Sequence, residues 1–131
     1  MYTAIRTLVA ALFIGVPFHG AKAELSAQET VIIQEKKGLR LVTSDGAVVG
    51  TADGVSVRDG RVRFYLLAKA GSIFSVGGGG KDVVVRTYTT NLTLRGADVI
   101  IDATEQRVKN KANMSFTDDS APIEINLFTR G

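Results

Sequence analysis

The chain has 131 residues, a formal net charge of +3 and 45% hydrophobic residues, which suits one domain with a modest core. It has no cysteine, and its one histidine is His19. Beyond position 23 there is neither residue type, so a Ser-His-Asp triad, a Cys-His dyad and a Cys/His zinc site are excluded in that part.

Residues 1–23 are typical of a secretory signal peptide. Arg6 supplies the positive charge, an apolar segment follows over 7–18, and Ala21-Lys22-Ala23 matches a cleavage site. A retained membrane anchor is the alternative, but the apolar run is shorter than the roughly 20 residues that span a bilayer. We therefore expect cleavage near Ala23 and a periplasmic or secreted chain. Loss of Arg6 and Lys22 lowers the formal charge from +3 to +1, which argues against nucleic acid as a partner.

Residues 24–37 follow the leader and contain Val31-Ile32-Ile33 between polar flanks. We expect this segment to form an N-terminal arm or a strand added to the main sheet. An exposed edge made by these three residues could also pair with a second copy of the chain.

The Asp59-Gly60 pair gives the clearest local signal, because an Asp-Gly turn between two alternating runs predicts a hairpin with a type I′ turn. A two-residue loop there places Arg58 opposite Arg61 and Ser56 opposite Arg63. It also gathers four apolar side chains on one face: Val55, Val57, Val62 and Phe64. The opposite face carries Ser56, Arg58, Arg61 and Arg63.

Other turns divide the neighbouring segments in the same way. Asp45-Gly46 can join residues 39–44 to residues 47–50. Further along, Ser72–Val76 and Lys81–Thr87 flank four consecutive glycines, with Val83 and Val85 on one face of the second strand. Short strands at this spacing indicate a small antiparallel barrel or sandwich.

Several short motifs occur in this chain in the same order as in a known protein family. They are Gly38-Leu39-Arg40-Leu41-Val42, Asp45-Gly46, Val49-Gly50, Val55-Ser56-Val57, Asp59-Gly60-Arg61-Val62 and, after a Gly-rich turn, Val83-Val84-Val85. Over residues 38–108 this order resembles the PRC-barrel family. The resemblance implies an all-β fold, a small antiparallel β-barrel of the PRC-barrel type, that serves as an interaction or assembly module. It supplies no catalytic residues. The chain departs from the pattern in its longer glycine run and in lacking a proline in the following strand.

The C-terminal part predicts three further elements. Residues 97–102 predict a strand, and 104–111 predict a short helix after the barrel, capped by Thr104 and with Glu105 in its first turn. Residues 109–131 then hold a loop and an added C-terminal strand, Ile123–Leu127, whose alternate apolar residues should be buried. We expect this strand to pair with Val31–Glu35.

No pattern in the sequence predicts a catalytic, cofactor or metal site. Asp45, Asp53 and Asp59 each precede glycine and are explained by turn chemistry. Lys81 after the glycine run lacks the Ser or Thr of a phosphate loop, since Asp82 follows it. The candidate site is a partner-binding patch of Arg58, Arg61 and Arg63. A solvated barrel exterior is the plainer interpretation; the sharper hypothesis is contact with an anionic partner surface or a lipid headgroup.

The favoured function is a non-enzymatic exported module that mediates protein–protein interaction or assembly in the cell envelope, with another envelope protein as partner and no cofactor. Two alternatives stay open. A small-ligand carrier or an enzyme would need a pocket with convergent polar groups. A structural protein would assemble with itself.

Overall fold

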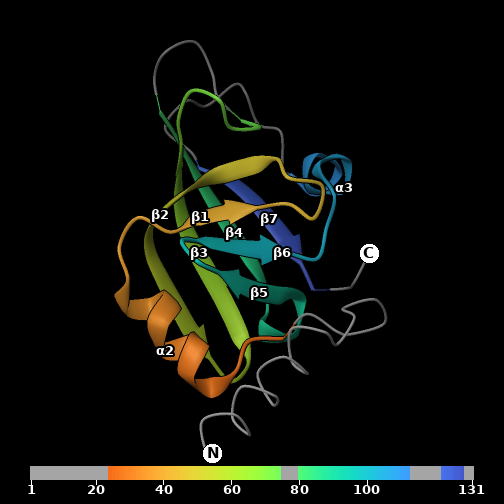
Figure 1. Ribbon diagram of the computed structural model, residues 1–131. Helices are drawn as coiled ribbons and strands as arrows, with labels where there is room; N and C mark the ends of the chain where they lie inside the picture. Colours follow the sequence, from red (N-terminus) through yellow and green to blue (C-terminus); the bar gives the residue numbers. More distant parts are fainter. Residues whose placement is uncertain (1–23, 75–79, 113–121, 129–131) are drawn as a thin grey trace, which may run out of the picture.

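The computed structural model describes residues 24–74, 80–112 and 122–128, and its main element is one seven-stranded sheet (Figure 1). The strands are β1 (Arg40–Val42), β2 (Val48–Arg58), β3 (Arg61–Ala68), β4 (Lys81–Tyr88), β5 (Leu92–Arg95), β6 (Asp98–Ile101) and β7 (Ile123–Leu127). The helices are α2 (Ala27–Glu35), α3 (Glu105–Lys111) and the 3-10 turn η1 (Thr89–Asn91). The mostly β character expected from the sequence is confirmed.

The sheet is mixed and open, which corrects the expectation of a closed antiparallel barrel. The strand order is β5-β6-β1-β2-β3-β4-β7, so β5 and β7 are its edges. The β1–β6 and β4–β7 pairs are parallel, whereas the other four are antiparallel. Parallel neighbours need a crossover connection rather than a tight turn. The long connection from β4 to β7, which includes α3, provides this crossover.

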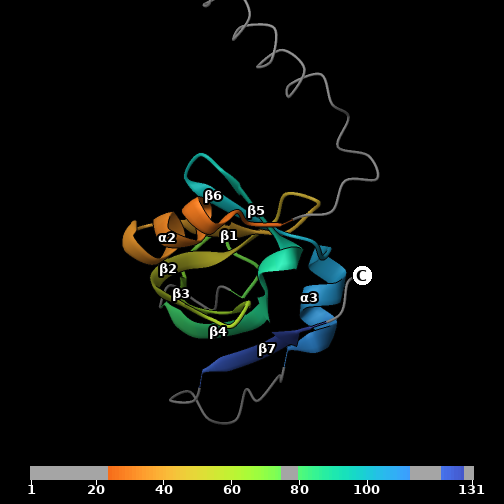
Figure 2. The ribbon, with the colours of Figure 1, turned by 90° about the horizontal axis from the view of Figure 1, so that it is seen from below.

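Helix α3 lies between the two ends of the curved sheet, beside β7 (Figure 2). At its N-terminus the backbone N–H of Glu105 donates to the Asp45 carboxylate in the β1–β2 turn, at 2.9 Å. At its C-terminus Ala112 forms an antiparallel bridge with Ile125 of β7. Val108 is buried in the core. The predicted helix is therefore confirmed, and it covers the opening that the sheet leaves.

The core fills the inside of the curve. Its residues alternate along the strands with less buried ones, as the sequence predicts for β3, β4, β6 and β7. The largest fully buried side chains are Phe64, Ile33, Leu39, Leu41, Leu92, Ile101, Ile125, Leu127, Val49, Val62, Val83 and Val85. The predicted burial of Ile123, Ile125 and Leu127 is confirmed.

Within residues 24–37, Ala27–Glu35 form helix α2, so the expectation of an added strand is wrong, whereas the alternative of an N-terminal arm stays a prediction. Ser26 and Glu29 make a capping box: the Glu29 N–H donates to the Ser26 hydroxyl, and the Ser26 N–H donates to the Glu29 carboxylate. These bonds satisfy donors at the helix start and outweigh the β preference of Val31-Ile32-Ile33. Consequently β7 pairs with β4 rather than with Val31–Glu35.

Three smaller differences also concern the strands. Residues 72–74 lie in a turn rather than in the expected strand, and β3 pairs directly with β4 from Ala68 opposite Lys81. β2 is one long strand with an irregularity between Ala52 and Gly54, where two strands were expected. β5 was not predicted. Residues 1–23, 75–79, 113–121 and 129–131 lie outside the described part, including the expected leader and most of the loop expected before Ile123. Within the described ranges, no helix has the length and apolar character to cross a membrane.

Candidate functional site

The β2–β3 hairpin positions the predicted arginines, and its register is the one expected. Arg58 pairs with Arg61, Val57 with Val62, Ser56 with Arg63 and Val55 with Phe64. Asp59 and Gly60 adopt φ angles of 53° and 77°, as a type I′ turn requires. Val62 and Phe64 are buried, whereas Arg58, Arg61 and Arg63 are exposed on the opposite face. The hairpin therefore holds three guanidinium groups on the outside of the sheet.

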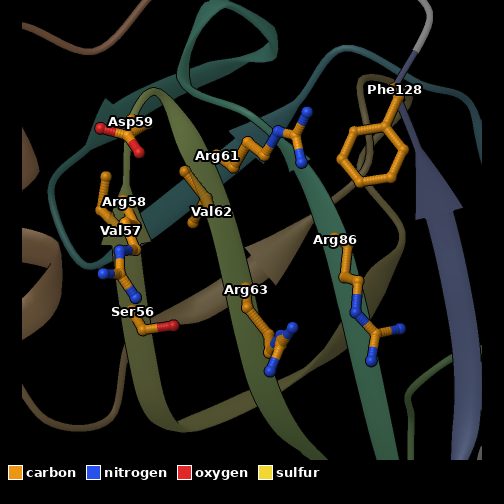
Figure 3. A pocket seen from close by; sticks show the side chains of 9 residues that line it. All are labelled: Ser56, Val57, Arg58, Asp59, Arg61, Val62, Arg63, Arg86 and Phe128. Atoms are coloured by element: carbon orange, nitrogen blue, oxygen red, sulfur yellow. The ribbon is translucent and has the colours of Figure 1, made fainter.

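A fourth arginine joins this group from β4. Arg86 is the register partner of Arg63, so the two side chains leave adjacent strands on the same face. We call Arg58, Arg61, Arg63 and Arg86 the arginine face. Figure 3 shows them extending from β2, β3 and β4. Placing Arg86 here requires the β3–β4 pairing, which the predicted hairpins alone do not give.

The four arginines differ in how far other described residues neutralise their positive charge. Nη1 of Arg86 lies 2.8 Å from Oε1 of Glu124 in β7. Nη1 of Arg63 donates to the Tyr65 hydroxyl at 3.2 Å, which supplies no negative charge. Within the described ranges, Arg58 and Arg61 form no side-chain hydrogen bond or ion pair, even with the nearby Asp59. Two directly opposed cations thus face solvent without an ion-pair partner among the described residues.

A hollow of about 950 Å³ lies over the arginine face. Its lining residues are Ser56, Val57, Arg58, Asp59, Arg61, Val62, Arg63, Arg86 and Phe128 (Figure 3). Phe128 follows β7 and is 37% exposed, and its ring packs on Tyr88 with centroids 5.0 Å apart. In Figure 3 the Arg61 side chain extends from β3 toward Phe128. The surface therefore combines cations with one exposed aromatic ring at its rim. Phe128 was not among the residues predicted for the site.

The chemistry available here is anion recognition. Guanidinium groups present planar arrays of N–H donors that match carboxylate, phosphate or sulfate oxygens. Each exposed ion pair contributes little alone, but several like charges over one hollow raise the local concentration of an oppositely charged partner. Within the described ranges, no group of three or more His, Cys, Asp or Glu residues is placed to hold a metal ion.

Comparison with known proteins gave no match among protein-family models, curated proteins or solved structures.

Proposed function

We propose that this protein is a non-enzymatic interaction module that binds an acidic protein surface through its arginine face. The observation that carries the proposal is the directly opposed pair Arg58 and Arg61, both exposed and without an acidic partner in the described structure. Like charges opposite each other across a strand pair are destabilising. A carboxylate from a partner would replace that repulsion with two charge-assisted hydrogen bonds.

The proposal includes the place where the module acts. The leader-like segment 1–23, with its cleavage signal at Ala21-Lys22-Ala23, supports export to the periplasm or beyond. The order of strands and turns over residues 38–108 supports a relationship to the PRC-barrel family, with the sheet left open and α3 in the gap. We therefore propose another envelope protein, or an assembly of such proteins, as the setting in which the arginine face works.

The test is site-specific photo-crosslinking in intact cells. The crosslinker replaces Ser56, which is exposed and lines the hollow. A protein captured by the wild-type face should be lost in the R58A/R61A/R63A variant. The matched control, K37A/K69A/R95A, removes three exposed cations that lie outside the hollow and should leave the capture unchanged. Capture that persists in the arginine variant would contradict the proposal.

A further inference from the structure

The same outward face of the sheet carries acidic residues at its other end. Asp53 lies at the irregularity of β2 and Asp82 near the start of β4, and both are exposed. With Tyr65 and Val84 they line a second hollow of about 380 Å³. Within the described ranges, neither aspartate forms a side-chain hydrogen bond or ion pair. This end therefore offers two carboxylates that have no ion-pair partner in the part of the chain that the structure describes.

Tyr65 separates the two ends of the face. Its side chain is 42% exposed, and it follows Arg61 and Arg63 on the outward side of β3. Asp82 is the register partner of Leu67. Leu67 lies six residues after Arg61 along β3. At about 3.4 Å per residue, the basic and acidic ends lie roughly 20 Å apart. Halfway between them, the outward side chains are Arg63 and Tyr65.

We propose that this face is self-complementary, and that a second copy of the chain docks on it about a two-fold axis near Tyr65. In an isologous interface the same patch serves both copies. Rotation about an axis halfway along β3 brings the Arg61 end of one copy over the Asp82 end of the other. The same rotation brings the Asp82 end of the first copy over the Arg61 end of the second. The inference rests on the proposed function, because it names the acidic surface that the arginine face binds.

The presence of both positive and negative charges on one face favours a second copy of the chain over other binding partners. A uniformly acidic protein or an anionic lipid surface would gain at Arg58 and Arg61, but it would be repelled by Asp53 and Asp82. A second copy in the antiparallel arrangement satisfies all four side chains. Tyr65 and Arg63 of both copies lie near the axis, so the Arg63 of one copy faces the Tyr65 ring of the other, and both residue types are enriched in interfaces.

The expected dimer is weak because the face is small. Strands β2, β3 and β4, about 4.8 Å apart and roughly 20 Å long, present about 300 Å² per copy, less than half of the roughly 800 Å² typical of a stable interface. Association should therefore be reversible, and it should weaken as salt screens the exposed charges.

The test is sedimentation equilibrium of the protein recovered from expressing cells, at low salt and up to about millimolar concentration. One variant reverses the basic end, R58E/R61E, and another reverses the acidic end, D53K/D82K. Each should dimerise at least about tenfold more weakly than wild type, because juxtaposed like charges oppose association. An equimolar mixture of the two variants should associate again, since both ends of the face are acidic in R58E/R61E and both are basic in D53K/D82K.

Three results would overturn the inference. They are a wild type that stays monomeric over this range, reversed variants that dimerise like wild type, and a mixture that fails to associate. A monomeric wild type that binds vesicles of anionic phospholipid would replace the second copy with a lipid surface. If the wild type is monomeric but crosslinking still depends on the arginines, the proposed function stands and this inference fails. Should D53K/D82K not fold, R61E and D82K as single variants provide the same comparison.

Discussion

The Asp45 carboxylate accepts a hydrogen bond of 2.9 Å from the backbone N–H of Glu105, the first residue of α3. The Thr104 hydroxyl caps the same helix end by accepting from the Arg107 N–H at 3.2 Å. Asp45 also accepts from the Thr43 hydroxyl within its own turn. A turn between β1 and β2 thus fixes the start of the helix that covers the open side of the sheet.

This contact predicts a pH-dependent contribution to stability. Hydrogen bonds from the Thr43 hydroxyl and then from the Glu105 N–H lower the pKa of Asp45 in the folded protein. A carboxylate with a lowered folded pKa stabilises the protein above its unfolded pKa of about 3.9, and this contribution is lost as pH falls through the folded value. Asp45→Asn should therefore be less stable than wild type at pH 7, and the difference should shrink toward pH 3.

Urea unfolding at pH 7 and pH 3 checks this prediction. Asp53→Asn is the matched control, because Asp53 is exposed and its side chain makes no contact of this kind in the described structure. A stability difference between Asp45→Asn and wild type that stays constant across this pH range would contradict the prediction.

A buried polar cluster should hold β7 against the end of β4. The Thr87 hydroxyl donates to the Leu127 carbonyl oxygen at 2.6 Å. The Asn91 amide donates to the Thr87 hydroxyl oxygen at 3.0 Å and to the Leu127 carbonyl oxygen at 3.3 Å. Thr87 and Asn91 are buried. Thr87→Val removes the hydroxyl and should cost about 1–3 kcal/mol, because the buried Asn91 amide loses one acceptor and the Leu127 carbonyl loses one donor.

The readout for this variant combines urea unfolding with amide hydrogen exchange of β7. Exchange at Ile125 should speed up relative to exchange in β3, since the lost bonds join β7 to its neighbour. Thr93→Val, on β5 and only partly buried, is the control and should cost less. Equal losses for the two threonine variants would show that the cluster does not stabilise β7.

Local sequence signals predicted the parts of the fold that are set by turns and alternation. Asp59-Gly60 fixes the β2–β3 register because its turn tolerates only one pairing of the flanking residues. The same period of two placed Val83 and Val85 on one face of their strand, which puts Arg86 on the other face. Thus three members of the arginine face, and the outward direction of the fourth, follow from the sequence.

Contacts between distant segments could not be predicted in this way. The meeting of Arg63 with Arg86 depends on β3 pairing with β4 across a twelve-residue connection, and Phe128 arrives through the parallel pairing of β7. Neither pairing leaves a local signal. The helix at 27–35 is a different case, because Ser26 and Glu29 match the capping-box spacing. Three consecutive β-branched residues favoured a strand and concealed that signal.

Alanine substitutions in this segment distinguish the helix from a strand. In a strand Val31 and Ile33 would share one face, but in α2 Ile33 is fully buried and Val31 is 51% exposed. Ile33→Ala should cost about 2–5 kcal/mol, because it opens a cavity in the core. Val31→Ala should change the free energy of unfolding far less. Similar losses for the two variants, measured by urea unfolding, would favour the strand.

The close approach of β2 and β3 at Gly50 gives a prediction for the base of the hairpin. A Cβ at Gly50 would lie 3.0 Å from both the Leu66 Cβ and the Leu67 backbone oxygen. The backbone oxygen cannot retreat without disturbing the β2–β3 ladder. Gly50→Ala should therefore cost about 1–3 kcal/mol through overpacking.

Gly54 lies on the same strand and serves as the control, since the nearest atom to its added Cβ is Tyr65 Cδ2 at an ordinary 3.8 Å. Gly54→Ala should leave the free energy of unfolding nearly unchanged. Because Gly50 lies at the base of the hairpin that carries Arg58 and Arg61, Gly50→Ala should also weaken capture through the arginine face under conditions where part of the protein is unfolded. If Gly50→Ala is as stable as Gly54→Ala, the two strands have more room to separate than these distances allow.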